Sequence, residues 1–242
     1  MEAIILAGGL GTRLRSVISE IPKPMAPIND KPFLEYILDF LNNQGIKRAV
    51  LSVGYKWEVI KEYFGDKYNN IELIYNVEKE RLGTGGAIKD SLKLINEKQV
   101  YVLNGDTYFN VPLKEMKLYD SLIQLALKEM KDFDRYGVVE IDEERKILNF
   151  KEKTYYEEGL INGGIYLMNK DIFDSFELPK KFSFEKFLEK NFKKLIATGK
   201  KFDGYFIDIG IPESYQKAKK YFLKNQKKKS SIISYANSWT KI

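Results

Sequence analysis

Residues 1–16 read MEAIILAGGLGTRLRS, and residues 21–28 read IPKPMAPI. The apolar run Glu2–Leu6 predicts a short buried strand, and a glycine-rich segment follows it at once. Glycine lets the backbone approach a ligand closely, and successive free N–H groups ahead of a helix form an anion site. Arg13 and Lys23 add two positive charges. The two stretches therefore predict a phosphate-binding loop in an enzyme that handles a nucleoside triphosphate.

Two other phosphate-binding motifs do not fit this spacing. A P-loop requires a Gly-Lys-Ser/Thr unit, which the chain lacks. A dinucleotide fingerprint requires a third glycine two residues after Thr12, where Leu14 stands. A tight turn without a ligand is the remaining alternative, and Arg13 together with Pro22-Lys23-Pro24 favours phosphate binding over it.

Composition limits the chemistry that the chain can perform. Its 242 residues, 44% of them hydrophobic, suffice for one large domain with a core. The chain has no cysteine and no histidine, which excludes disulfides, thiolate catalysis and the commonest general base. Catalysis must use carboxylates, Lys, Arg, hydroxyls and hard metal ions. Without a long apolar segment or a signal peptide pattern, we expect a cytoplasmic protein with no membrane partner.

The net charge of +6 raises the question of nucleic-acid binding. Lysine is spread along the whole chain, and part of the excess lies in residues 224–229. We therefore interpret these charges as a solvated surface and expect no nucleic-acid partner.

Strand and helix patterns alternate through the first half of the chain. The predicted strands are 2–6, 48–53, 71–75 and 100–103, and the predicted helices are 33–43, 57–64 and 86–95. This alternation predicts an α/β fold with a Rossmann-like, mostly parallel central sheet flanked by helices. Ligands of such sheets bind beyond the carboxyl ends of the strands, where the glycine loop and Asp106 both fall.

The second half is less regular. Its predicted strands are 122–128, 137–141, 147–150, 159–168 and 202–207, and its predicted helices are 170–176, 184–198 and 212–223. No linker divides the chain, so we expect one domain over residues 1–223, with halves of roughly 1–110 and 111–223. Residues 224–242 lose the pattern and are interpreted as a basic tail, which is either flexible or a docking segment.

Four separated motifs resemble those of the sugar-phosphate nucleotidyltransferases. They are LAGGLGTRL with PKPMAPI, KPFLEYILDFL, LSVGYKWEVIKEYFG and LGTGGAI. The last three are most similar to the D-glycero-α-D-manno-heptose 1-phosphate guanylyltransferases, and the mannose-1-phosphate guanylyltransferases come next. The resemblance runs to about Tyr221. It implies the nucleotidyltransferase fold, in which a smaller sheet extension in the second half carries the sugar site.

The resemblance also implies roles for individual residues. Arg13 and Lys23 would be catalytic, with Lys23 contacting the triphosphate and the sugar phosphate. The nucleotide would be bound by Leu6, Ala7, Gly8, Gly9, Gly11, Thr12, Glu78, Gly83, Thr84 and Asp106, and the sugar phosphate by Gly105, Glu152, Lys153, Asn162 and Gly163. Without the resemblance, Thr84 reads equally well as a helix cap, Glu152 and Lys153 as a charged edge strand, and Asn162 as a strand-entry turn with a bulge.

Asp106 and Asp208 each follow a predicted strand. Two carboxylates at strand ends can share one Mg²⁺, which prefers oxygen ligands and keeps triphosphate oxygens in its shell. Either aspartate alone could equally cap a turn. Because both match family positions, we expect both to bind Mg²⁺.

The combined prediction is a Mg²⁺-assisted, in-line transfer of a nucleotidyl group from GTP to D-glycero-α-D-manno-heptose 1-phosphate. The oligomeric state stays open at this point, and a homodimer is one candidate. A mannose-1-phosphate guanylyltransferase, or another hexose-1-phosphate nucleotidyltransferase, is the first alternative. A non-catalytic nucleotide-sugar-binding regulator is the remote one.

Overall fold

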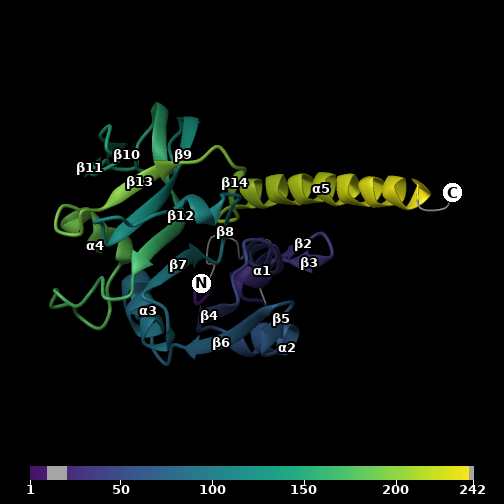
Figure 1. Ribbon diagram of the computed structural model, residues 1–242, viewed down its shortest axis with the longest axis horizontal. Coiled ribbons are helices and arrows are strands. Elements are labelled where there is room, and N and C mark those ends of the chain that lie inside the picture. The colour runs from purple at the N-terminus through teal and green to yellow at the C-terminus, as the bar shows by residue number, and fades with distance from the viewer. Residues whose placement is uncertain (10–20, 240–242) are drawn as a thin grey trace.

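The computed structural model describes residues 1–9 and 21–239, with side chains up to residue 225. Within these residues, eight strands form a central sheet in the order β13-β9-β12-β7-β1-β4-β6-β5, and helices flank it (Figure 1). The predicted α/β class is confirmed.

The elements have the following bounds. The central sheet consists of β1 (Glu2–Leu6), β4 (Arg48–Val53), β5 (Lys67–Tyr68), β6 (Ile71–Val77), β7 (Gln99–Asn104), β9 (Ile123–Phe133), β12 (Tyr156–Asn169) and β13 (Thr198–Lys201). Three ribbons pair β2 (Pro27–Ile28) with β3 (Lys31–Pro32), β8 (Thr107–Phe109) with β14 (Phe206–Asp208), and β10 (Val139–Ile141) with β11 (Ile147–Phe150). The α-helices are α1 (Phe33–Asn43), α2 (Trp57–Phe64), α3 (Gly83–Ser91), α4 (Phe184–Asn191) and α5 (Pro212–Trp239), and the 3-10 turns are η2 (Lys23–Met25), η3 (Leu92–Leu94) and η4 (Leu113–Glu115).

The register of the parallel strands aligns their carboxyl ends. β1 lies between β4 and β7 and is parallel to both, so that Leu6 is opposite Ser52 on one side and Asn104 on the other. β12 then continues the sheet antiparallel to β7 and β9. The chain therefore leaves β1, β4 and β7 at one common edge, where open α/β sheets bind ligands.

Successive residues of β1 point to opposite faces of the sheet, and a separate core covers each face. Ala3 and Ile5 pack in the core that includes α1, α2 and the first part of α5, where Phe222 packs on Tyr36. Ile4 packs in the core that includes α3 and α4. The sheet is thus buried on both faces, which explains the continuous apolar runs in β1 and β4.

Helix α5 extends away from the body of the molecule (Figure 1). The helix predicted over 212–223 continues to Trp239, so that the segment interpreted as a tail is helical up to that residue. Among the described residues, no helix combines the length and the hydropathy that crossing a bilayer requires.

The first half follows the predicted pattern closely. β1, α1, β4 and α2 have the predicted bounds, and α2 ends at Phe64, immediately before Gly65, whose φ of 64° a side chain would strain. Helix α3 begins at Gly83 instead of Gly86.

Three predictions for the second half are wrong. Residues 170–176 form turns instead of a helix, because the Asn169 side chain accepts from the Asp171 N–H and the following hydrogen bonds span three residues. Helix α4 ends at Asn191, well before Thr198, which instead begins β13 and pairs with β9. Of the strand predicted over 202–207, only Phe206 and Ile207 lie in a strand, β14, because β13 ends at Lys201 and residues 202–205 belong to no strand.

Gly204 lies in the break between β13 and β14 and explains it. A Cβ at this position would lie 1.7 Å from the carbonyl oxygen of Asn110, so only glycine allows the two backbones to approach so closely. The chain changes partners at this point: β13 pairs with β9, whereas β14 pairs with β8.

Candidate active site

Two cavities open at the edge where the parallel strands end. The first, of about 590 Å³, is lined by Leu6, Gly8, Gly9, Lys23, Pro24, Ser52, Glu78, Arg81, Gly83, Thr84, Ala87, Asn104, Asp106 and Glu185. The second, of about 510 Å³, extends over the second half of the chain. Lys23, Asn104, Asp106 and Glu185 line both cavities. The two cavities therefore meet at these four residues.

Lys23 and Asp106 form an ion pair at this junction. Lys23 lies in the short turn η2 between two prolines, and its side chain is only 10% exposed. Proline fixes φ, so the turn holds the lysine with little backbone freedom. Asp106 lies two residues after the end of β7 and also accepts a hydrogen bond from the Thr107 hydroxyl at 3.1 Å. The structure thus brings together a cation and a carboxylate that lie 83 residues apart in the sequence.

Asp208 lies close to Asp106 because of the β8–β14 ribbon. Asp208 pairs with Thr107 in that ribbon, and the Ile209 N–H donates to the Asp106 carbonyl at 2.9 Å. Both carboxylates line the second cavity. The described residues contain no group of three or more potential metal ligands of the His, Cys, Asp and Glu types. Two carboxylates that line one cavity nevertheless fit a hard cation that takes its other ligands from phosphate and water.

Arg135 and Tyr136 contact Asp208, and neither residue was predicted from the sequence. The Arg135 Nη2 donates to both Asp208 oxygens, at 3.1 and 2.9 Å, and the Tyr136 hydroxyl donates to Oδ2. Burial, and then the Asp208 carboxylate, raise the pKa of Tyr136 well above its usual value, which keeps the phenol a donor. The only signal in the sequence was a polar Asp-Arg-Tyr-Gly run ahead of a predicted strand.

The first part of the glycine loop lies at the carboxyl end of β1. Leu6, Gly8 and Gly9 line the first cavity, whereas Ala7 is buried and donates its N–H to the Ser52 carbonyl at 2.8 Å. A Cβ on Gly8 would lie 3.0 Å from the Glu78 Oε1, so this glycine allows the loop to pass close to Glu78. The remaining predicted loop residues, Gly11, Thr12 and Arg13, lie outside the described residues.

Glu78 is fixed in the wall of the first cavity. Its Oε2 accepts from the Leu82 N–H at 3.1 Å, and its Oε1 accepts from the Ser52 hydroxyl at 3.2 Å. The side chain thus spans the end of β4 and the start of α3, two elements that flank the cavity.

The glycines of LGTGG serve the packing of α3. A Cβ on Gly83, which has φ of 70°, would lie 2.5 Å from the Phe182 carbonyl oxygen, and a Cβ on Gly85 would lie 2.2 Å from the Phe182 ring. The Thr84 hydroxyl accepts from the Phe184 N–H and donates to Glu185, so that it joins α3 to α4 instead of capping its own helix. Gly83 and Thr84 still line the cavity.

The predicted sugar residues surround the second cavity. Glu152, Lys153, Asn162 and Gly163 line it. The Asn162 side chain accepts from the Gly164 N–H at 3.0 Å and donates to the Tyr166 hydroxyl at 2.9 Å, within a bulge of β12. Gly105 does not line this cavity and instead packs against β1, where a Cβ would lie 2.6 Å from the Leu6 carbonyl oxygen.

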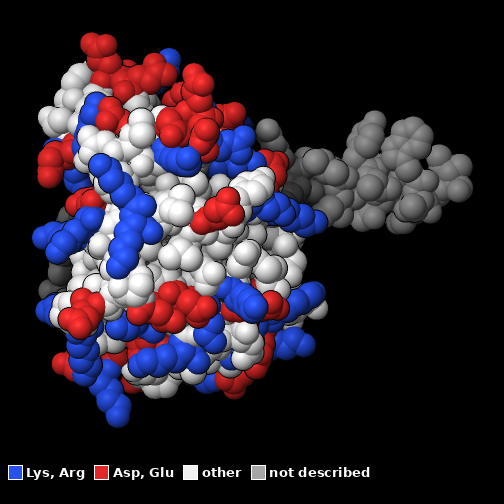
Figure 2. Space-filling view, turned by 60° about the vertical axis from the view of Figure 1, so that its left-hand side comes forward, with Lys and Arg blue, Asp and Glu red and all other residues white. Residues whose placement is uncertain are grey.

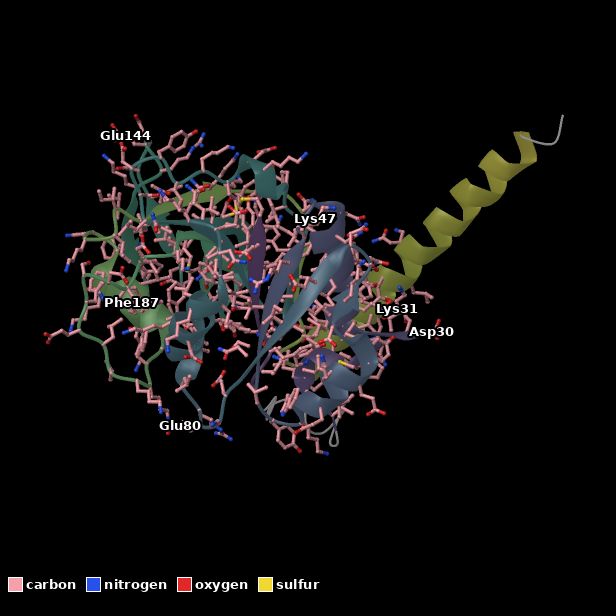
Figure 3. The ribbon with its side chains drawn as sticks, turned by 60° about the horizontal axis from the view of Figure 1, so that its bottom comes forward. Asp30, Lys31, Lys47, Glu80, Glu144 and Phe187 are labelled. Carbon is pink, nitrogen blue, oxygen red and sulfur yellow. The ribbon has the colours of Figure 1, made fainter. Side chains whose placement is uncertain are left out.

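Charges around the body are mixed in sign. Figure 2 shows Lys and Arg interspersed with Asp and Glu over the face that it presents. In Figure 3, Glu80 lies in the loop beyond the carboxyl end of β6, far from Lys47, which immediately precedes β4. Glu80 forms an ion pair with Lys180 that ties this loop to the segment before α4.

Comparisons with known proteins now decide the family. The model of the family described as nucleotidyl transferase matches residues 2–225. The chain belongs to this family. It is 60% identical over 215 residues to the D-glycero-α-D-manno-heptose 1-phosphate guanylyltransferase of Campylobacter jejuni, which covers 89% of this chain and 97% of that protein.

Two further relatives extend the comparison within the nucleotidyl transferase family. The protein of the same name from Aneurinibacillus thermoaerophilus is 54% identical, over 91% of this chain and 97% of its own. The crystal structure of HddC from Yersinia pseudotuberculosis, complexed with GMP-PN, superimposes with a TM-score of 0.80 at 39% identity, over 91% of this chain and 99% of that one.

Proposed function

We propose that this chain transfers a guanylyl group from GTP to D-glycero-α-D-manno-heptose 1-phosphate, with release of pyrophosphate. The observation that carries the proposal is the meeting of two cavities at Lys23 and Asp106. Such an arrangement suits a reaction between two polyanions that must be held end to end. The names of the two relatives with 60% and 54% identity support guanine and heptose in particular.

In the proposed reaction, an oxygen of the sugar phosphate attacks the α-phosphorus of GTP. The new oxygen–phosphorus bond forms as the bond to the bridging oxygen breaks, and pyrophosphate leaves with that electron pair. The attacking oxygen is already an anion at neutral pH, so a chain without histidine needs no general base. Catalysis then consists of positioning and of stabilising the charge that develops at the transferred phosphorus.

Among the cations that the structure describes, Lys23 is the one that lines both cavities, so it is placed to act on both substrates. Arg13 and the amides of the glycine loop are proposed to hold the triphosphate. Asp106 and Asp208 would hold a Mg²⁺, whose chemistry is to neutralise charge on the phosphates. Glu78 is proposed to accept hydrogen bonds from the N–H groups of guanine, as a carboxylate held in one position can. Adenine does not present the same N–H groups to that carboxylate.

Residues of the second cavity are proposed to bind the sugar phosphate. Glu152 and Asn162 would contact sugar hydroxyls, and Lys153 would contact the phosphate. GDP-heptose is an activated sugar, so the reaction that consumes it would be glycosyl transfer, as in the assembly of a surface polysaccharide. We propose that the protein acts in the cytoplasm.

The test is pyrophosphate release with Mg²⁺ across GTP, ATP, CTP, UTP and dTTP. Each nucleotide is paired with D-glycero-α-D-manno-heptose 1-phosphate, mannose 1-phosphate or glucose 1-phosphate. We expect release with GTP and the heptose phosphate. Release with another pair only would change the assignment of the two substrates. No release with any pair would leave the alternative of a non-catalytic nucleotide-sugar-binding regulator.

A further inference from the structure

The carboxylate of Asp208 has an unusually complete set of donors. Its Oδ1 accepts from the Gly210 N–H at 2.6 Å and from the Arg135 Nη2 at 3.1 Å. Its Oδ2 accepts from the same Nη2 at 2.9 Å and from the Tyr136 hydroxyl. A carboxylate offers about four lone-pair sites, and four contacts occupy them here. Any further ligand of Asp208 must therefore replace one of these donors.

Arg135 is the donor most easily replaced. The Gly210 N–H belongs to backbone that a hydrogen bond from Ile209 to Asp106 fixes, and the Tyr136 ring packs edge-on against Phe206. The Arg135 side chain is 32% exposed and lines the second cavity. Because it carries a positive charge, it is also the donor that a cation arriving at Asp208 would repel.

A second contact would keep the released guanidinium at the site. The Arg135 Nη1 donates to the Ser214 hydroxyl at 2.8 Å, in the first turn of α5. Held there, the side chain remains beside the cavity that contains Lys23 and Lys153. A planar guanidinium is well suited to bind phosphate through two parallel hydrogen bonds.

We propose that Arg135 is an exchangeable counter-cation: it holds Asp208 while no divalent cation is bound, and it passes to the phosphate of the sugar 1-phosphate when one binds. The proposal rests on the proposed function, because it places a divalent cation at Asp208. It predicts that Arg135 opposes metal binding in the free protein and favours phosphate binding once the metal is present.

The charges at the site also indicate that metal and phosphate assist each other's binding. Without substrates, Asp106 is paired with Lys23 and Asp208 with Arg135, so two negative charges balance two positive ones. A divalent cation adds two positive charges, which a sugar phosphate then compensates. Metal and phosphate should therefore assist each other's binding, and Arg135 is the group through which they do so.

The experiment measures Mn²⁺ affinity of the full chain, without substrates, from the free Mn²⁺ signal in electron paramagnetic resonance. We expect Arg135→Gln to bind Mn²⁺ about tenfold more tightly than the wild type, since a neighbouring charge alters proton affinity of a carboxylate by about that factor or more. Tyr136→Phe frees one lone pair without changing charge and should give a smaller gain. Arg48→Gln removes a similar cation, which pairs with Glu2 instead, and should change nothing.

A second measurement follows binding of inorganic phosphate by calorimetry with Mn²⁺ present. Here Arg135→Gln should bind phosphate about tenfold more weakly, the opposite direction to its effect on the metal. Arg135→Lys, which keeps the charge, should leave Mn²⁺ affinity near the wild-type value and provides a second variant if Arg135→Gln does not fold.

Asp208→Asn separates this inference from the proposed function. If Asp208→Asn leaves Mn²⁺ affinity unchanged, the proposed metal site is wrong, and the exchange is wrong with it. If Asp208→Asn weakens Mn²⁺ binding while folded Arg135→Gln binds Mn²⁺ no more tightly than the wild type, the metal site stands and the exchange alone is overturned.

Discussion

The ion pairs Arg48–Glu2 and Arg135–Asp208 lie at opposite ends of strands, and the two carboxylates have different surroundings. Glu2, at the amino end of β1, accepts from Arg48 at 2.7 Å and from the N–H groups of Asn96 and Glu97 at 2.6 and 2.9 Å. Asp208, at the carboxyl end of β14, is held largely by the side chains of Arg135 and Tyr136. The Glu2 side chain is 6% exposed and faces backbone, whereas Asp208 lines a cavity.

The difference shows how one pairing chemistry serves two purposes. Backbone donors cannot leave unless the fold opens, so the Glu2 network is a permanent tie between β1, β4 and the loop before β7. Side-chain donors beside a cavity can be exchanged for a ligand. We therefore expect changes at the amino end to alter stability and changes at the site to alter catalysis.

The largest expected effect is that of Lys23→Ala on turnover. This change removes the cation shared by both cavities, and we expect turnover to fall by about 10²–10³-fold, as when one preorganised donor to a transition state is lost. Steady-state pyrophosphate release measures the loss. Lys47→Ala, an exposed lysine at the amino end of β4, is the matched control. Near-normal turnover of Lys23→Ala would contradict the expectation that changes at the site, unlike changes at the amino end of the strands, alter catalysis.

Glu2→Gln should have the converse effect. The amide cannot match the charge-assisted contacts with Arg48, and one of its two polar atoms no longer accepts, so we expect the free energy of unfolding to fall by about 1–3 kcal/mol. Turnover should stay at the wild-type level. Urea unfolding measures the loss, with the exposed Glu62→Gln as control. A large drop in turnover without a drop in stability would contradict the structural role.

Glu78→Gln tests the guanine assignment more finely. The amide places a donor where a carboxylate oxygen accepts, so we expect the ratio of kcat/KM for GTP over ATP to fall about tenfold, or about 1.4 kcal/mol. Glu80→Gln makes the same chemical change two residues away in an exposed position and should leave the ratio unchanged. An unchanged ratio in Glu78→Gln would assign guanine recognition to other groups.

The smallest expected effect is the pH dependence of the Glu2 contribution. Burial alone would raise the pKa of the Glu2 carboxyl, but the Glu97 N–H, Arg48 and the Asn96 N–H together lower it below its ordinary value of 4.5. The folded state therefore binds the proton less tightly than the unfolded state, so the contribution is complete above 4.5 and is lost as the pH falls through the lowered pKa. The stability difference between wild type and Glu2→Gln should shrink between pH 6 and about pH 3. A constant difference would be contrary to this account.

Local patterns in the sequence predicted the first half of the fold well. α1 and α2 have clear apolar spacing and end near Gly45 and Gly65, so their bounds follow from nearby residues. The wrong helix at 170–176 has a local cause too, but one that apolar spacing does not reveal: the Asn169 side chain competes for the backbone.

In the site, too, the residues in local motifs were predicted, whereas those that depend on distant contacts were not. Lys23, Asp106 and Asp208 stand in recognisable motifs, and the structure places them around one junction. Arg135 and Tyr136 were not predicted, because their contact with Asp208 spans more than 70 residues and depends on how the β8–β14 ribbon meets the turn before β10. No property of residues 134–137 alone indicates which carboxylate they face.

Gly204 has a consequence for the genetics of the protein. It lines neither cavity, yet the close approach of its backbone to Asn110 precedes the ribbon that sets Asp208 beside Asp106. Any side chain there must push the segment before β14 away from Asn110, directly after β8, and so disturb the pairing that holds Asp208 beside Thr107. A random search for inactive variants should therefore recover Gly204 together with the charged residues of the site, as a position whose only contribution is the absence of a side chain.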